Sequence, residues 1–321
     1  MNTLIEVKDL KKYFKTHKGN LHAVDGVSFA IAKGETLGVV GESGCGKSTL
    51  GRITIHLLEA TSGSIRFEGE DISQFNRVDL KRYRQDMQMI FQDPFSSLDP
   101  RMSVSNIIAE PLKIYGKYKD SADLSEQVGK LMDTVGLARR LSDSYPHELD
   151  GGRRQRIGVA RALSLNPKFI VCDEPVSALD VSIQAQILNL MQDLQEEFNL
   201  TYLFITHNMA VVKHISDNIL VMYMGKMVEY ASSKNIFAER LHPYTKALLA
   251  AVPVPVLGGK KGRHLLKGEI TSPINPKPGC RFAKRCDYAT EICSTEDPAF
   301  IEVKAGHFAA CHHVKSINGL S

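Results

Sequence analysis

A glycine-rich segment constrains the fold of this chain more than any other feature. The sequence GESGCGKST, residues 41–49, fits the pattern G-x-x-x-x-G-K-[ST]. It follows the apolar run ETLGVV and precedes a segment of helical period, so the local order is strand, loop, helix. Backbone N–H groups of such a loop, and the positive end of the helix after it, converge on anionic oxygens. The sequence therefore predicts a phosphate-binding loop.

The residue types of this loop suit a triphosphate with its magnesium ion. Glycines at positions 41, 44 and 46 allow the backbone to approach the β-phosphate. We expect Lys47 to neutralise the β and γ oxygens and the Ser48 hydroxyl to bind Mg²⁺. We interpret Cys45 as a small residue at a tolerant position, not as a redox switch. The predicted triphosphate contacts of the loop are Ser43, Gly44, Cys45, Gly46, Lys47, Ser48 and Thr49.

A second segment, KFIVCDEP at residues 168–175, supplies two carboxylates. Its apolar residues predict a buried strand, which delivers Asp173 to hold Mg²⁺ directly or through water. Glu174 is then placed to orient or deprotonate an attacking water. Together the two segments predict a nucleoside-triphosphatase.

Composition sets the class of protein and its compartment. The 321 residues, 43% hydrophobic and 24% charged, are ordinary for a soluble chain of about two domains. Lys and Arg exceed Asp and Glu by only 40 to 36, without a basic block, so no nucleic-acid partner is expected. No apolar run reaches the ~20 residues of a membrane span, and the start lacks the order of a signal peptide. We expect a cytosolic protein without a transmembrane segment.

The order of elements predicts an α/β fold. The start of the chain is β-rich, charged helix-forming sequence follows from about residue 77 to 141, and strands alternate with helices after residue 146. Such alternation indicates a parallel sheet with crossover helices. We predict an ATPase domain over 1–253, with a helical subdomain inserted at about 93–158. Residues 254–321, rich in Pro, Gly and Cys, are predicted to form a loop-rich C-terminal extension.

Further motifs carry a family resemblance. HELDGGRRQRIGVARAL, residues 147–163, resembles the signature motif of ATP-binding cassette (ABC) ATPases. In the expected order, Gln92 in MIFQDP resembles the Q-loop, SALD (residues 177–180) the D-loop, and His207 in FITHNM the switch histidine. The resemblance covers about residues 3–255. It implies an ABC-type nucleotide-binding domain with a RecA-like parallel core, an antiparallel β subdomain and a helical subdomain.

The resemblance also implies roles for single residues. Phe14 or its neighbour Tyr13 is expected to stack on adenine. Gln92 is expected to sense Mg²⁺ and a membrane partner, and His207 to contact the γ-phosphate. The implied catalytic set is Glu174, His207, Lys47 and Gln92, and the implied Mg²⁺ ligands are Ser48, Gln92 and Asp173. The residues implied to contact a partner subunit's ATP are Leu149, Asp150, Gly151, Gly152, Arg153 and Asp180.

The signature departs from the usual L-S-G-G-Q at Asp150 and Arg153. Asp and Ser are both good N-caps, so the helix start can survive. A carboxylate ~4 Å from a γ-phosphate costs about 4 kcal/mol at an effective dielectric of ~20, whereas a lost hydroxyl hydrogen bond costs about 1 kcal/mol. Repulsion dominates unless Arg153 or Arg154 neutralises the carboxylate. We therefore expect a weak or silent site behind this signature, and a heterodimer with a second ABC ATPase.

Two stretches narrow the family. IFQDPFSSLDPRMSV and HPYTKALLAAVP are similar to ATPase subunits of dipeptide and oligopeptide importers, the second ATPase type above all. That resemblance implies ATP-driven peptide import with two integral membrane permease subunits, at the cytoplasmic face of the membrane. A nickel importer ATPase is one alternative. A soluble ABC ATPase acting on nucleic acid or ribosomes is another, but the chain has neither a coiled-coil insert nor a second cassette.

Four cysteines share the end of the chain. Cys280, Cys286, Cys293 and Cys311 are spaced C-x5-C-x6-C-x17-C, and clustered thiols in a reducing compartment indicate metal before disulfide. Structural zinc sites usually begin with closer pairs, whereas iron–sulfur clusters also take four thiolates. We predict a 4Fe-4S cluster, with Zn²⁺ or free thiols as alternatives. His307, His312 and His313 lie near enough in sequence to replace a ligand, but a polar tail needs no such role for them.

Overall fold

The computed structural model describes residues 2–93, 95–251 and 273–320. Contacts divide the chain into two compact units. The phosphate-loop unit comprises Asn2–Ile31, Thr36–Ser73 and Thr206–Ser321, and the signature unit comprises Ala32–Glu35 and Gln74–Ile205. The predicted domain boundary at residue 253 lies outside the described residues.

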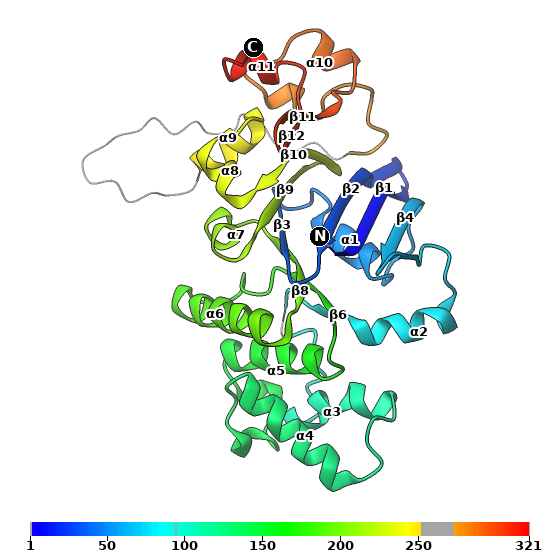
Figure 1. Ribbon diagram of the computed structural model, residues 1–321, viewed down its shortest axis with the longest axis vertical. Helices are drawn as coiled ribbons and strands as arrows, with labels where there is room; N and C mark the ends of the chain where they lie inside the picture. Colours follow the sequence, from blue (N-terminus) through cyan, green and yellow to red (C-terminus); the bar gives the residue numbers. More distant parts are fainter. Residues whose placement is uncertain (1, 94, 252–272, 321) are drawn as a thin grey trace, which may run out of the picture. The chain divides into compact units, whose positions relative to one another are not determined.

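The phosphate-loop unit begins with an antiparallel sheet, as the β-rich start of the sequence predicts. Its strand order is β2-β1-β4-β5, and Figure 1 shows β1, β2 and β4 in blue shades. Ile5 lies opposite Phe67 and Val7 opposite Ile65, so buried apolar pairs fix the register. The strands are β1 (Thr3–Thr16), β2 (Gly19–Ala32), β4 (Ser62–Phe67) and β5 (Glu70–Asp71).

A second sheet of the same unit carries the phosphate loop. Within this unit the strand order is β11-β12-β10-β9-β3; β3 and β9 are parallel and the other pairs antiparallel. Every residue of β3 is buried, which matches its unbroken apolar sequence. The strands are β3 (Thr36–Val40), β9 (Asn218–Tyr223), β10 (Lys226–Ser232), β11 (Phe300–Lys304) and β12 (His307–Ala310). The helices before the extension are α1 (Lys47–Thr54), α7 (Met209–Ile215), α8 (Ser233–Ala238) and α9 (Pro243–Ala250).

The extension contains more regular structure than the sequence indicates. Strand β12 pairs with β10, and β11 pairs with β12, so the extension continues the sheet of the phosphate-loop unit. Both strands are short, and neither shows a long periodic pattern in the sequence. Residues 300–310 of the predicted loop-rich extension thus contain two short paired strands that the sequence pattern does not indicate. Its helical turns are η3 (Ala283–Arg285), α10 (Ile292–Thr295) and α11 (Val314–Ile317).

The signature unit combines parallel strands with helices. Strand β7 lies between β6 and β8 and is parallel to both, as the alternation of strands and helices predicts. Helix α3 packs on α4 and α5, and α5 also packs on α6 (Figure 1). Its strands are β6 (Met87–Ile90), β7 (Phe169–Asp173) and β8 (Thr201–Thr206). Its helices are α2 (Arg77–Asp86), α3 (Val104–Ile114), α4 (Ser121–Thr134), η1 (Arg139–Leu141), η2 (Pro146–Glu148), α5 (Gly151–Leu163) and α6 (Val181–Phe198).

Side-chain caps explain where the longer helices of this unit begin. Asp150 accepts a hydrogen bond from the backbone N–H of Arg153 at the start of α5, and Asp180 accepts one from Ile183 at the start of α6. Asn76 caps α2 in the same way. In the described parts of the chain, no helix has the length and apolar character of a membrane span.

Candidate nucleotide-binding site

The phosphate loop connects β3 to α1 as predicted. Gly46, which caps α1, has φ 107°. A Cβ on Gly46 would lie 2.0 Å from the carbonyl oxygen of Ala23, and one on Gly41 would lie 2.2 Å from that of Met222. Because backbone atoms occupy these positions, the loop can follow this path only with glycine there.

Lys47 is folded back over the loop. Its Nζ donates hydrogen bonds to the carbonyl oxygens of Gly41, at 2.7 Å, and Glu42, at 3.0 Å. The side chain is buried, with 4% of its surface exposed. A buried ammonium needs such acceptors, and phosphate oxygens can compete for the same donors.

The other residues of the loop differ in exposure. Ser43 and Gly44 are exposed, whereas Ser48 and Thr49 are half-buried at the start of α1. Cys45 is buried, and this burial raises the pKa of its thiol. The thiol is therefore protonated at neutral pH, a poor state for redox chemistry.

The carboxylate pair sits at the end of β7. Asp173 is fully buried, and Glu174 has only 9% of its surface exposed. Glu174 has φ 47°, a left-handed conformation that is costly for a residue with a side chain. Its N–H donates to the carbonyl of Ile205 at 2.9 Å, and Nε2 of Gln92 lies 3.4 Å from its Oε2. The structure thus brings together Gln92 and Glu174, two of the predicted catalytic residues.

Tyr13 and Phe14 are consecutive on β1, so their side chains point to opposite faces of the strand. The Tyr13 ring stacks on His22, with ring centroids 3.9 Å apart, and its hydroxyl donates to Asp25 at 2.5 Å. The ring of Phe14 lies 5.1 Å from Nζ of Lys12. Burial, followed by the bond to Asp25, raises the pKa of Tyr13, so the hydroxyl remains a donor.

The predicted switch histidine, His207, and the predicted D-loop aspartate, Asp180, lie next to helix starts. His207 is exposed and directly precedes Asn208, whose side chain accepts from Ala210 at the start of α7. The exposed Asp180 accepts from the N–H of Ile183 at 3.0 Å, and this bond lowers its pKa. His207 belongs to the phosphate-loop unit and Asp180 to the signature unit.

In the signature, Asp150 has an arginine beside it. Nε of Arg153 lies 3.4 Å from Oδ2 of Asp150, and both side chains are exposed. Arg154 instead donates to the carbonyl of Pro146 at 2.5 Å, and its guanidinium lies 3.6 Å from the ring centroid of Phe95. Of the two arginines, Arg153 is therefore the one that lies beside the carboxylate. Leu149 is buried and Gly151 and Gly152 open α5.

The four late cysteines are brought into one part of the extension. The N–H of Cys280 donates to the carbonyl of Cys293 at 2.8 Å. Burial, together with the nearby Cys311, Cys293 and Cys286 thiols, raises the pKa of the Cys280 thiol to about 11. Burial also raises the pKa of the Cys311 thiol, and the Cys286 and Cys293 thiols act in the same direction. All four sulfur atoms are thus close enough to influence one another.

The arrangement of these thiols does not support the predicted metal site. Among the described residues, no three His, Cys, Asp or Glu side chains are arranged to hold a metal ion. Without a bound cation, nothing draws the four sulfur atoms together at one point. The nearby histidines have other partners: His307 contacts Glu229 at 2.7 Å, His312 the carbonyl of Glu296 at 2.9 Å, and His313 the hydroxyl of Thr290 at 2.7 Å.

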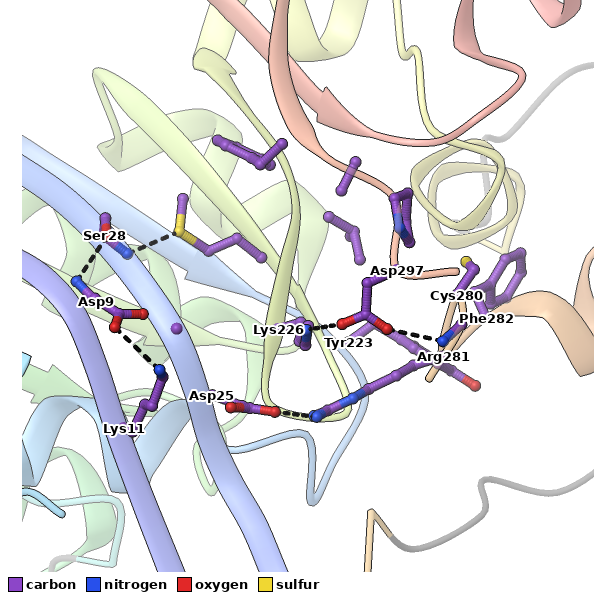
Figure 2. A pocket seen from close by; sticks show the side chains of 17 residues that line it. Asp9, Lys11, Asp25, Ser28, Tyr223, Lys226, Cys280, Arg281, Phe282 and Asp297 are labelled. Atoms are coloured by element: carbon purple, nitrogen blue, oxygen red, sulfur yellow. Dashed lines mark hydrogen bonds and ion pairs between the residues drawn. The ribbon is translucent and has the colours of Figure 1, made fainter. Parts of the chain in front are cut away.

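A cavity of about 510 Å³ lies in the phosphate-loop unit where the extension meets β1, β2 and β10 (Figure 2). Charged side chains line it in pairs. Lys11 lies 3.0 Å from Asp9, Lys226 lies 2.5 Å from Asp297, and Arg281 pairs with Asp25. No sequence pattern indicated Asp25 or Glu42, and Glu42 occupies a variable position of the phosphate-loop pattern.

Comparisons with known families agree with this fold and these motifs. Residues 24–177 match the family described as ABC transporter, and residues 228–293 match the oligopeptide/dipeptide transporter C-terminal region. Among solved structures, cbiO1 of Clostridium perfringens is 27% identical with a TM-score of 0.66, covering 75% of this chain and 92% of that one. The ATP-binding cassette MJ0796, solved as a dimer bound to ADP and Pi, is 26% identical with a TM-score of 0.65, covering 72% and 99%. Fold and motifs together define an ABC ATPase.

Curated relatives match over nearly the full length. The oligopeptide transport ATP-binding protein AppF of Bacillus subtilis is 52% identical over 97% of both chains. The oligopeptide transport ATP-binding protein OppF of Haemophilus influenzae is 51% identical over 95% of this chain and 93% of its own. The chain belongs to the ATP-binding subunits of ABC transporters, in the branch that carries the oligopeptide/dipeptide C-terminal region.

Proposed function

We propose that this chain hydrolyses ATP to energise the import of di- or oligopeptides through a membrane ABC transporter. The observation that carries the proposal is the match of residues 228–293 to the oligopeptide/dipeptide C-terminal region, within a chain about half identical to oligopeptide transport ATP-binding proteins. That region distinguishes the chain from ABC ATPases in general.

In this proposal the phosphate loop grips the triphosphate. Lys47 exchanges the carbonyl oxygens of Gly41 and Glu42 for phosphate oxygens. Ser48, Gln92 and Asp173 carry hydroxyl, amide and carboxylate oxygens, the donor types that suit Mg²⁺. The bound ion would neutralise charge on the phosphates.

Hydrolysis is assigned to Glu174 with help from Gln92 and His207. A carboxylate held in a strained backbone and largely shielded from solvent is suited to orienting and deprotonating a water molecule. Gln92, within hydrogen-bond distance of Glu174, links this group to the segment that precedes α3. His207 is assigned to the γ-phosphate on the family resemblance.

A second ATPase subunit completes the site, and the two form a heterodimer. The signature residues and Asp180 of this chain then face the partner's ATP. Arg153 lies beside Asp150, but both side chains are exposed, and exposed ion pairs contribute little. We therefore keep the assignment of a weak site behind this signature and a stronger one at Lys47 and Glu174.

The chain is proposed to act at the cytoplasmic face of the membrane, bound to two integral membrane permease subunits. Phe95, with 65% of its surface exposed and Arg154 over its ring, lies close in sequence to Gln92 and offers an apolar contact for such a subunit. ATP-driven closure of the paired ATPases would be transmitted there.

Reconstitution tests the proposal. The chain is co-expressed with its candidate partner ATPase and two membrane subunits, and the assembly is purified and placed in vesicles. We expect ATP-dependent uptake of a labelled peptide and none with Lys47→Ala. Uptake of Ni²⁺ in place of peptide would assign the chain to nickel import. Binding to ribosomes or nucleic acid without membrane subunits would contradict transport altogether.

For the four cysteines we propose an iron–sulfur cluster, with zinc as the alternative. Their mutual proximity supports the proposal, whereas the arrangement of their side chains does not match a bound metal. Iron, acid-labile sulfide and zinc are measured on protein purified without oxygen. Four titratable thiols with none of these elements would show free cysteines.

A further inference from the structure

The extension holds the phosphate loop through Arg285. This arginine ends the helical turn η3, and its two terminal nitrogens lie 2.6 and 3.1 Å from the two carboxylate oxygens of Glu42. The exposed fractions of the two side chains are only 8% and 21%. A two-point, charge-assisted contact shielded from water is stronger and more directional than a surface ion pair.

Glu42 is coupled to the lysine of the loop. Its carbonyl oxygen accepts from Nζ of Lys47 at 3.0 Å, and its N–H donates to the Tyr244 hydroxyl at 2.8 Å. A displacement of Glu42 therefore moves an acceptor of the ammonium that we assign to the triphosphate. The Glu42 carboxylate would also repel a triphosphate if no cation neutralised it.

Arg281 makes a second contact of the same kind. Its side chain, 8% exposed, pairs with Asp25 and donates to the carbonyl of Met224; Figure 2 shows it extending to Asp25. Asp25 accepts from the Tyr13 hydroxyl, and its N–H donates to the carbonyl of Gly225 at 2.8 Å. The N–H of Gly225 in turn donates to the carbonyl of Cys45 at 2.8 Å. Arg281 thus reaches both the phosphate loop and a candidate adenine contact.

Attachment of the extension does not by itself explain these contacts. Phe282, between the two arginines in sequence, is buried against Tyr223 and Tyr244, and β12 pairs with β10. These contacts already bind the extension to the unit. Both arginines instead end on residues around the nucleotide-binding loop.

We propose that Arg281 and Arg285 are positioning residues for ATP, by which the extension sets the affinity of the phosphate loop. The proposal rests on the assignment of ATP to Lys47. Arg285 neutralises and fixes Glu42, and Arg281 fixes Asp25 and the turn beside Cys45. The segment from Cys280 to Cys286, which carries both arginines, then controls nucleotide binding from outside the known ATPase motifs.

Titration of the full-length chain with a non-hydrolysable Mg–ATP analogue tests this proposal. Loss of the shielded two-point contact in Arg285→Gln is expected to weaken binding about tenfold. Lys284→Gln, an exposed cation on the same turn, is the matched control and should bind as the wild type does. Equal affinity of Arg285→Gln and Lys284→Gln would overturn the proposal.

A double-mutant cycle separates positioning from a general loss of structure. If Arg285 acts through Glu42, adding Arg285→Gln to Glu42→Gln should change affinity by less than about twofold. A further tenfold loss in the double variant would show that Arg285 does not act through Glu42. In the same way, if Arg281 acts through Asp25, adding Arg281→Gln to Asp25→Asn should change affinity by less than about twofold.

Two further variants keep the result interpretable. Where Arg285→Gln does not fold, Arg285→Lys replaces it, since lysine keeps the charge but loses the two-point geometry. About threefold weaker binding would support the proposal, and unchanged binding would overturn it. Lys47→Ala tests the ATP assignment separately, because loss of this lysine should abolish binding of the analogue. A wild-type chain that binds no analogue refutes the proposed function, whatever the arginine variants do.

Discussion

Glu174 combines a shielded carboxylate with a backbone conformation that few side chains adopt. Glu174 directly follows a fully buried strand and has a φ of 47°, and its N–H donates a hydrogen bond to the carbonyl of Ile205. Strain of this kind persists only where the surroundings over-determine it, and it clusters at active sites. At the scale of single residues, this is the strongest structural support for the catalytic assignment.

Changing Glu174 to Gln should therefore separate binding from hydrolysis. The amide keeps the size of the side chain but cannot take a proton, so ATPase activity of the assembled complex should fall about 10²- to 10⁴-fold while ATP is retained. Activity and bound nucleotide are measured together. Glu196→Gln, an exposed change on α6, should leave both unchanged. Normal turnover in Glu174→Gln would remove Glu174 from the mechanism.

The signature offers a second test at this scale. The pair Asp150→Ser with Arg153→Gln restores L-S-G-G-Q, and Ser keeps the N-cap of α5. We expect ATPase activity of the assembled complex to rise, because the carboxylate that we propose to face the partner's γ-phosphate is gone. Arg140→Gln with Asp143→Ser removes two exposed, opposite charges of the same unit and is the control. No gain over this control would end the idea of a site weakened by Asp150.

Among the elements, α9 begins at a histidine that is buried without charge. Nδ1 of His242 accepts from the N–H of Tyr244 at 3.1 Å, and burial lowers the pKa of His242 to about 4 from 6.5. The imidazole of His242 binds a proton more readily in the unfolded chain than in the folded one. Its contribution to the stability of the folded chain is therefore complete above pH 6.5 and disappears as pH falls to about 4. The shift corresponds to about 3 kcal/mol.

His242→Asn isolates that contribution, since Asn keeps a capping acceptor and does not titrate. The difference in unfolding free energy between pH 7 and pH 5, measured with urea, should be smaller in this variant than in the wild type. His17→Asn, at an exposed histidine, should keep the wild-type difference. Identical pH dependence in all three proteins would refute the role of His242.

The attachment of the extension depends on Phe282. This side chain is 2% exposed, and its ring lies 5.3 Å from that of Tyr223 and 5.4 Å from that of Tyr244. Phe282→Ala should lower the unfolding free energy by about 3–5 kcal/mol. Phe300→Ala, at a ring 38% exposed, should cost clearly less, and equal losses would show that Phe282 is not an anchor.

For the whole chain, the sequence predicted the ATPase part far better than the extension. The phosphate loop, the buried strand before Asp173 and the cap at Asp150 are local patterns, so residue order alone reveals them. The contacts of Arg281 and Arg285 join residues more than two hundred positions apart, and no local pattern encodes them. The short β12 is a strand only because β10 offers it an edge.

At this scale, the proposed asymmetry of the two ATPase subunits makes a prediction. Lys47→Ala should abolish most ATPase activity of the assembled complex, because in this proposal the partner's signature completes the site of this chain. The corresponding lysine of the partner should matter much less, because this chain's Asp150 faces that site. Steady-state ATPase assays of both single variants show which of the two lysine changes causes the larger loss of activity. Equal losses would indicate two equivalent sites.

The crowding around Gly41 and Gly46 restricts which mutations their codons can accept. Carbonyl oxygens lie 2.2 and 2.0 Å from where a first side-chain carbon would be placed. Every missense change of a glycine codon introduces that carbon, whatever base is altered. Drift at these two codons is thus limited to synonymous changes, and even the mildest replacement, alanine, should behave as a null allele.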